Sequence, residues 1–202
     1  MLSESHRRMH VLVAGLALAV LLLVGGTASY LVHIRRMATE LIASAREIRT
    51  TEDAEREIAA WKVRAGNGFW TESDHHGEDH NYDASIVNVP IARLRVVQPT
   101  EVTVGLTMRD QKLRCVTVIE STGWHPVASV WIQEWFDTDM PDRFHVATKG
   151  RPSRAVLQFP STLPDAERRK AFAVNTSCLV KPKGCRSADD ILPGVWLFAP
   201  KS

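Results

Sequence analysis

The sequence predicts an α+β protein in which an N-terminal transmembrane helix and a helical stalk precede a mainly antiparallel β-sheet domain with short helices. Three observations lead to this expectation: a charge-free apolar run, helical apolar spacing after it, and alternation with a period of two beyond Gly68. The 202 residues then divide into an N-terminal tail (1–10), a transmembrane helix (11–34), stalk and docking helices (35–66) and an extramembrane domain (67–202).

The composition is that of a folded chain and excludes several classes of protein. Charged residues make up 24% and apolar residues 45%, which argues against wholesale disorder. The formal net charge of +2 lacks the strong basic excess typical of nucleic-acid binding, so we expect no nucleic-acid partner. Three cysteines are too few for a miniprotein built on disulfides.

The apolar run near the N-terminus has the length and composition of a membrane span. Residues 11–26 contain no polar side chain, and the stretch continues without charge to Val32. As a helix, residues 11–32 extend roughly 33 Å at ~1.5 Å per residue, enough for a hydrocarbon core of ~30 Å. A core helix of a water-soluble domain would carry a polar face. We therefore expect residues 11–34 to cross a lipid bilayer once.

Two questions about this segment stay open at the level of sequence. Gly26-Thr27-Ala28 resembles the cleavage site of a signal peptide, so removal of the segment is an alternative to anchoring. By the positive-inside rule, the arginines that closely follow the span favour a cytoplasmic domain. The cysteines favour the opposite side, and long domains translocate despite a modest charge bias, so we expect an extracytoplasmic domain.

The next residues predict two helices with an apolar stripe each. The first stripe comprises Ala38, Leu41, Ile42, Ala45 and Ile48. Thr50-Thr51 is a candidate N-cap for the second helix, which carries Ala54, Ile58, Trp61 and Ala65 and ends near Gly66. We expect a stalk helix and a helix that docks on the domain, with coiled-coil dimerisation as the alternative.

Strands follow with punctuation by glycine and proline. Residues 102–108 alternate between apolar and polar side chains, and a turn at 109–112 joins them to a second strand at 113–120. Further strands are expected near 82–89, 127–136, 144–148 and 155–159. A short helix is expected from Pro164, with Thr162 as its cap. Short connections favour antiparallel pairing.

Cys178 and Cys185 enclose a turn-rich loop that contains Pro182 and Gly184. A disulfide closing these eight residues would stabilise the fold by about 2.5 kcal/mol in the chain-entropy model. Two free thiols in a reducing compartment are the alternative. Cys115 lies within a predicted strand and is expected to be a buried apolar side chain.

The closing segment CLVKPKGCRSADDILPGVW, Cys178 to Trp196, contains a capping-box pattern at Ser187 and Asp190. It resembles the ending of uncharacterised bacterial single-pass membrane-anchored proteins, which have an N-terminal span, a helical stalk and an α+β domain. The resemblance implies an envelope protein and supplies no catalytic residue.

The sharpest chemical cluster is the run from Asp74 to His80. Imidazole and carboxylate groups are transition-metal ligands, so His75, His76 and His80 form a candidate site for a divalent metal. A solvated acidic loop is the alternative, because Glu72 to Asp83 holds five acids and no Lys or Arg.

Other local patterns have simpler explanations. Asp137, Asp139 and Asp142 lack the glycine and glutamate of a calcium loop and are expected to form a surface turn. Trp131 and Trp135 share strand parity and are expected to pack across strands. The sequence has no G-x-S-x-G, P-loop or S-x-x-K motif.

Together these patterns favour a membrane-anchored, non-catalytic envelope domain that binds or scaffolds another envelope component. The alternative function is a metal- or ligand-sensing domain that uses the acidic loop from His75 to His80.

Overall fold

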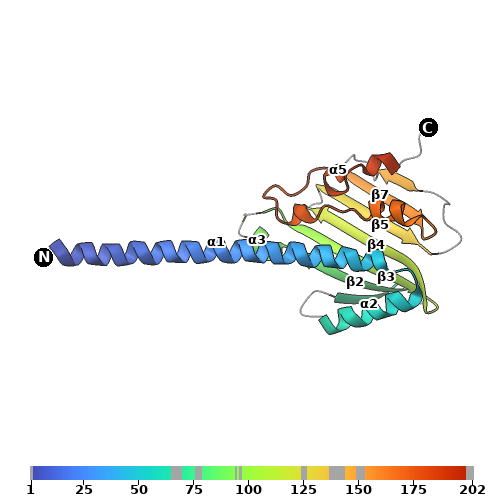
Figure 1. The fold of residues 1–202 in the computed structure, drawn as a ribbon, viewed down its shortest axis with the longest axis horizontal. Helices are drawn as coiled ribbons and strands as arrows, with labels where there is room; N and C mark the ends of the chain where they lie inside the picture. Colours follow the sequence, from blue (N-terminus) through green and yellow to red (C-terminus); the bar gives the residue numbers. More distant parts are fainter. Residues whose placement is uncertain are drawn as a thin grey trace.

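The computed structural model describes residues 2–64, 70–75, 79–93, 95, 97–123, 127–136, 144–148 and 153–198, with only the backbone at 2–8, 64 and 70–75. A long N-terminal helix runs into a domain built on a seven-stranded sheet (Figure 1). The predicted α+β class is confirmed.

Helix α1 (Leu2–Glu47) continues from the apolar run into the domain without a break. Its N-terminal half is long and apolar enough to cross a membrane, and its large apolar side chains from Met9 to Val24, and Val32, are exposed. From Ile34 onward one stripe is buried against the sheet: Ile34, Ala38, Leu41, Ile42 and Ala45, followed by Ile48 just beyond the helix. Residues expected to form a stalk therefore belong to the core of the domain.

Helix α2 (Thr51–Arg64) begins at the predicted cap. The Thr50 hydroxyl accepts from the Asp53 N–H at 3.1 Å, and the Asp53 carboxylate accepts from the Thr50 N–H at 3.2 Å. This reciprocal bonding satisfies N–H groups that a helix start leaves free. Ala54, Ile58 and Trp61 are buried, so α2 docks on the sheet as expected, whereas Gly66 lies outside the described residues.

The sheet has the strand order β1-β2-β3-β4-β5-β7-β6. Its strands are β1 (Trp70–His75), β2 (Asp79–Val87), β3 (Thr100–Arg109), β4 (Lys112–Thr122), β5 (Ala128–Trp135), β6 (His145–Thr148) and β7 (Arg154–Pro160). All neighbouring pairs are antiparallel except β5 and β7, which are parallel. The expected antiparallel pairing therefore holds for most of the sheet. It fails for one pair, because β7 is antiparallel to β6 but parallel to β5.

One expected loop is part of this sheet. The sequence places Asp74 to His80 in a loop, but β1 and β2 pair from Trp70↔Ala84 to His75↔Asp79. β1 is an edge strand, and backbone hydrogen bonds can form it without the apolar alternation that reveals a half-buried strand. The loop expectation was therefore wrong for Asp74, His75, Asp79 and His80.

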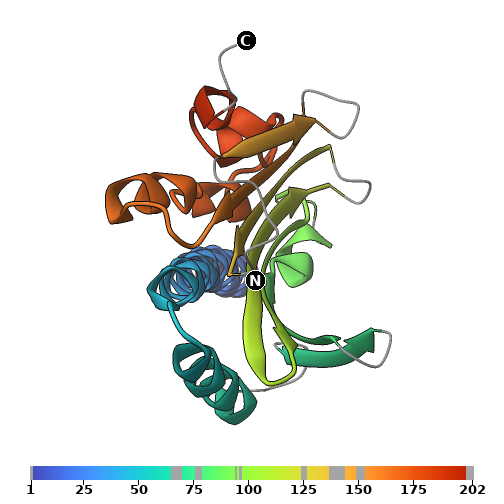
Figure 2. The same cartoon turned by 90° about the vertical axis from the view of Figure 1, so that its right-hand side faces the viewer.

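Helices cover one face of the sheet. Figure 2 shows α1, α2 and α4 on the same side of it. The short helices are α3 (Val89–Ala92), α4 (Asp165–Ala171), η1 (Thr176–Leu179), α5 (Ala188–Ile191) and η2 (Val195–Phe198). Ser187 and Asp190 form the predicted capping box of α5, whereas α4 starts at Pro164 with no side-chain cap, so the cap predicted at Thr162 is wrong.

The main core lies between the helices and the sheet. Alternate residues of β3, namely Val102, Val104 and Leu106, are fully buried there, while Thr103 and Thr107 point to the other face. Burial of these alternate positions fixes the register of the central strands, because a slip of one residue would expose the apolar set.

Candidate functional site

An open groove of about 350 Å³ lies between α2 and the strands β2 and β3. Helical spacing brings one face of α2 to it, and strand alternation brings His80 and Tyr82. Its lining residues are Glu55, Ile58, Ala59, Lys62, His80, Tyr82, Met108 and Gln111.

The groove combines an apolar floor with charged groups beside it. Ile58 and Met108 are almost fully buried, whereas His80 and Lys62 are exposed. The Lys62 ammonium lies 5.7 Å from the centre of the Tyr82 ring. Such a surface can hold an apolar side chain next to a polar group of a partner.

The structure places the predicted metal residues as follows. His75 ends β1, His80 lies in β2 opposite Asp74, and His76 lies outside the described residues. Among residues whose side chains are described, no three His, Cys, Asp or Glu gather closely enough to hold a metal ion. The site formed by His75, His76 and His80 therefore stays a prediction.

The neighbouring Asp79 is held by arginine. Arg109 donates to its two carboxylate oxygens at 2.6 and 2.9 Å, and Arg114 lies 3.6 Å away. The hydrogen bonds from Arg109 lower the pKa of Asp79. This carboxylate serves to join β2 to β3 at the end of the sheet.

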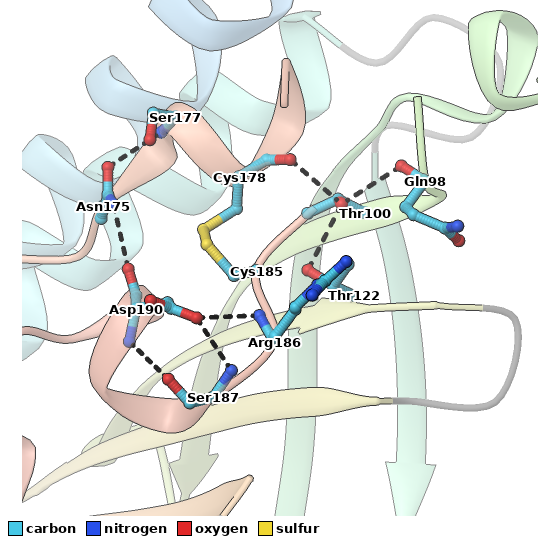
Figure 3. The surroundings of a disulfide bond; sticks show 10 residues. All are labelled: Gln98, Thr100, Thr122, Asn175, Ser177, Cys178, Cys185, Arg186, Ser187 and Asp190. Atoms are coloured by element: carbon cyan, nitrogen blue, oxygen red, sulfur yellow. Dashed lines mark hydrogen bonds between the residues drawn. A yellow bond between two sulfur atoms is a disulfide. The ribbon is translucent and has the colours of Figure 1, made fainter. Parts of the chain in front are cut away.

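The structure joins Cys178 and Cys185 in a disulfide with a Cα–Cα distance of 5.2 Å, and both residues are buried (Figure 3). The Thr100 hydroxyl lies 3.4 Å from the Cys178 carbonyl and 3.4 Å from the Thr122 hydroxyl. These contacts fasten the disulfide loop to the start of β3 and the end of β4. Cys115 lies outside this disulfide and is buried, as expected from the sequence.

Asn88 links the chain segments next to the disulfide loop through hydrogen bonds. Its side chain is fully buried and donates to the carbonyls of Gln98 (2.9 Å) and Leu179 (2.7 Å), and it accepts from the Thr100 N–H (2.7 Å). The sequence analysis did not identify Asn88, because its partner Leu179 lies 91 residues away.

A buried ion pair holds the C-terminal end of α1 in place. Arg168 of α4 donates to both carboxylate oxygens of Glu134 on β5, and the two side chains are 1% and 0% exposed. The same guanidinium donates to the carbonyls of Arg46 and, at 2.9 Å, Ile48. It thereby satisfies carbonyl groups that the end of a helix leaves free. Burial raises the pKa of Glu134, and Arg168 offsets part of that rise.

Glu120 of β4 is also a buried acid, but unlike Glu134 it is not paired with an arginine in the part of the chain that the structure describes. It is 1% exposed, and neither carboxylate oxygen has a hydrogen-bond partner among the described residues. Burial raises its pKa well above the ordinary value, and Lys181 opposes this rise. The buried site therefore favours the neutral form of the carboxyl group.

The two tryptophans of β5 lie on the sheet face away from the helices. Trp131 pairs with Ile119 of β4, and the Arg114 guanidinium lies 5.9 Å from the centre of the Trp135 ring. Both indoles are half-buried, which fits cross-strand packing. Asp137, Asp139 and Asp142 lie outside the described residues.

Asn88 and the ion pair of Arg168 and Glu134 thus hold elements together, and the groove beside α2 is one accessible site that the described residues offer to a partner. Comparisons with protein-family models, curated proteins and solved structures found no match to this chain.

Proposed function

We propose that this chain is a single-pass membrane-anchored envelope protein whose β-rich domain binds or scaffolds another component and catalyses no reaction. One observation carries the proposal: the exposed apolar residues and the buried core residues of α1 belong to a single unbroken helix. A span that continues into the core fixes the position of the domain relative to the bilayer. That arrangement suits the presentation of a binding surface.

The groove beside α2 supports the binding role. It is open to solvent, and its lining includes Gln111 of the β3–β4 turn. This turn lies at the end of the sheet where α1 stops, as shown by the bond from the Leu113 N–H to the Thr51 hydroxyl (3.0 Å). A partner could therefore approach the groove without contacting the apolar half of α1.

The disulfide supports an extracytoplasmic position for the domain, because structural disulfides persist in oxidising compartments. Arg35 and Arg36, directly after the apolar stretch, favour the other side. We give the disulfide more weight, since long domains translocate largely regardless of nearby charge.

Thiol counting in cells tests the side. Cells are quenched in acid, and the unfolded chain is labelled with a maleimide that adds mass. We expect one reactive thiol, from Cys115, without reductant and three after reduction. A Cys115→Ser variant serves as the control and should show none and two. Three reactive thiols without reductant would overturn the extracytoplasmic assignment.

Membrane extraction and site-specific crosslinking test the anchor and the binding role. The full-length chain should stay in the pellet after alkaline carbonate treatment. A photoreactive residue at Lys62, in the groove, should give a discrete crosslinked species that the same residue at the exposed position Arg169 of α4 does not give. A chain released by carbonate would refute the anchor, and identical crosslinking at both positions would refute the groove.

A second function, metal or ligand sensing, is favoured by the position of His80 in the groove that Glu55 also lines. Equilibrium dialysis of the full-length chain in detergent with zinc, nickel or copper tests it. Retention of metal that is lost in the His80→Ala variant would support sensing. No retained metal at micromolar concentration would end this proposal.

A further inference from the structure

We propose that the end of the domain that carries α3 rests on the bilayer and that Arg93 and Arg95 bind anionic lipid headgroups there. This inference rests on the proposed membrane span. It adds a second contact with lipid, made by the folded domain itself.

The position of α3 along the long helix supports this inference. A hydrocarbon core of ~30 Å takes up about 20 helical residues, so a span that starts at Val11 ends near Tyr30. Tyr30 and Leu31 pack against a small cluster formed by Ile91, Ala92 and Val97, which belong to α3 and the segment after it. This cluster therefore lies at the level where hydrocarbon gives way to headgroups.

Figure 1 shows the same relation in the whole molecule, with α3 at the end of the domain nearest the apolar half of α1. Tyr30 occupies a depth at which aromatic side chains are enriched in membrane proteins. Ile34, one helical turn further on, is already buried in the domain at 4% exposure. The folded domain thus begins at the membrane surface.

The charges at this end fit an anionic surface. Arg93 and Arg95 are exposed beside the apolar cluster, and Arg35 is exposed on α1. The disulfide loop adds exposed Lys181 and Lys183, and the bond from the Gln98 N–H to the Pro182 carbonyl (3.1 Å) ties the loop to the same edge.

Acidic groups at this edge offset only part of that charge. Glu40 pairs with Arg36 at 2.8 Å, and Glu101 is exposed at the start of β3. Cationic side chains close to an anionic leaflet are attracted within about one Debye length, ~8 Å at physiological salt. Anionic phospholipid is therefore the occupant that the position and the charge favour together.

The experiment measures how deep this edge lies in vesicles. The full-length Cys115→Ser chain, with its disulfide intact, carries a spin label at Gln98→Cys, which leaves all the basic residues in place. A matched chain carries the label at Lys112→Cys, at the start of β4. Both are reconstituted into vesicles of phosphatidylglycerol and phosphatidylcholine, and the collision rate of each label with a water-soluble nickel chelate is recorded.

We expect a severalfold lower collision rate at position 98 than at position 112 in vesicles that contain phosphatidylglycerol. The variant Arg93→Gln/Arg95→Gln should lose most of this difference, and the control Arg169→Gln/Lys170→Gln on α4 should keep it. Vesicles of pure phosphatidylcholine should show a smaller difference.

Three outcomes would overturn a proposal, and they can be told apart. A chain that does not float with vesicles refutes the anchor and with it the proposed function. A floating chain with equal collision rates at positions 98 and 112 refutes only the contact of the domain with lipid. A difference that is unaffected by lipid charge or by Arg93→Gln/Arg95→Gln refutes recognition of anionic headgroups.

Discussion

The two ends of the helix-covered sheet face are fastened by different chemistry. Where α1 ends, Arg168 is paired with buried Glu134 and donates to the carbonyls of Arg46 and Ile48. At the end near the apolar half of α1, a disulfide and the uncharged side chains of Asn88 and Thr100 hold the strands. The second region also contains the lone carboxyl of Glu120.

The difference follows from what α1 offers in each region. The last four carbonyls of a helix have no partner within the helix, so a buried helix end needs donors from elsewhere, and a cation meets the helix dipole favourably. In the middle of a helix, each backbone carbonyl already accepts a hydrogen bond from an N–H group of the same helix. The region near Asn88 therefore needs no charge to hold α1, and neutral hydrogen bonds suffice.

The largest expected effect comes from breaking the charged end. Arg168→Met leaves Glu134 as an uncompensated buried charge and deprives the Arg46 and Ile48 carbonyls of their donor. We expect the free energy of unfolding to fall by about 3–5 kcal/mol. Urea unfolding of the full-length chain in detergent micelles, followed by tryptophan fluorescence, measures the change.

Two further variants make this test specific. The exposed neighbour Arg169→Met should change the free energy of unfolding by less than about 0.5 kcal/mol. The double variant Arg168→Met/Glu134→Leu should recover most of the loss, because the buried charge is gone. If Arg168→Met cost no more than Arg169→Met, the ion pair would not fasten α1.

A smaller effect is expected from removing the disulfide at the end of the sheet near Asn88. Cys178→Ala/Cys185→Ala removes the link across an eight-residue loop, and we expect a loss of about 2.5 kcal/mol in the free energy of unfolding. Reduction of the wild-type chain should give the same loss in the urea experiment. Cys115→Ser should leave the response to reductant unchanged. No shift of the urea midpoint on reduction would contradict this expectation.

Features that depend on neighbouring residues could be predicted from the sequence. The apolar run of α1, the cap at Thr50, the capping box of Ser187 and Asp190, and the β3–β4 hairpin were all correct. Each rests on a spacing of a few residues, and local spacing decides helix ends and tight turns.

Features that depend on distant partners could not be predicted in this way. Three consecutive basic residues, Arg168 to Lys170, look alike in sequence, and only the folded chain shows that Arg168 is buried against Glu134, 34 residues away. The groove required α2 to pack beside β2 and β3. The sequence singled out His80 as a metal ligand but gave no sign of Lys62 or Tyr82 beside it.

The smallest expected effect concerns the buried carboxyl of Glu120, at the end of the sheet near Asn88. Glu120→Met keeps a side chain of similar size and removes two polar atoms that lack hydrogen-bond partners among the described residues. Because a buried polar group without a partner costs about 1–3 kcal/mol, we expect the variant to be more stable by that amount or less. An exposed acid of the neighbouring strand, changed in Glu101→Met, is the matched control and should have little effect.

The dependence of this stability gain on pH shows whether the charge of Glu120 causes it. The pKa of Glu120 is raised above its ordinary value of 4.5, so the folded chain keeps a proton that the unfolded chain releases. The contribution of Glu120 to stability is then greatest below the ordinary pKa and falls as the pH rises towards the raised pKa. Asp53, Asp79 and Asp190 have lowered pKa values, so their contributions are lost only on acidification below the ordinary value of 3.8. The gain from Glu120→Met should therefore grow as the pH rises above the ordinary value of 4.5. A gain that does not change with pH above 4.5 would mean that packing, and not the charge of the carboxylate, sets the difference in stability between Glu120→Met and the wild-type chain.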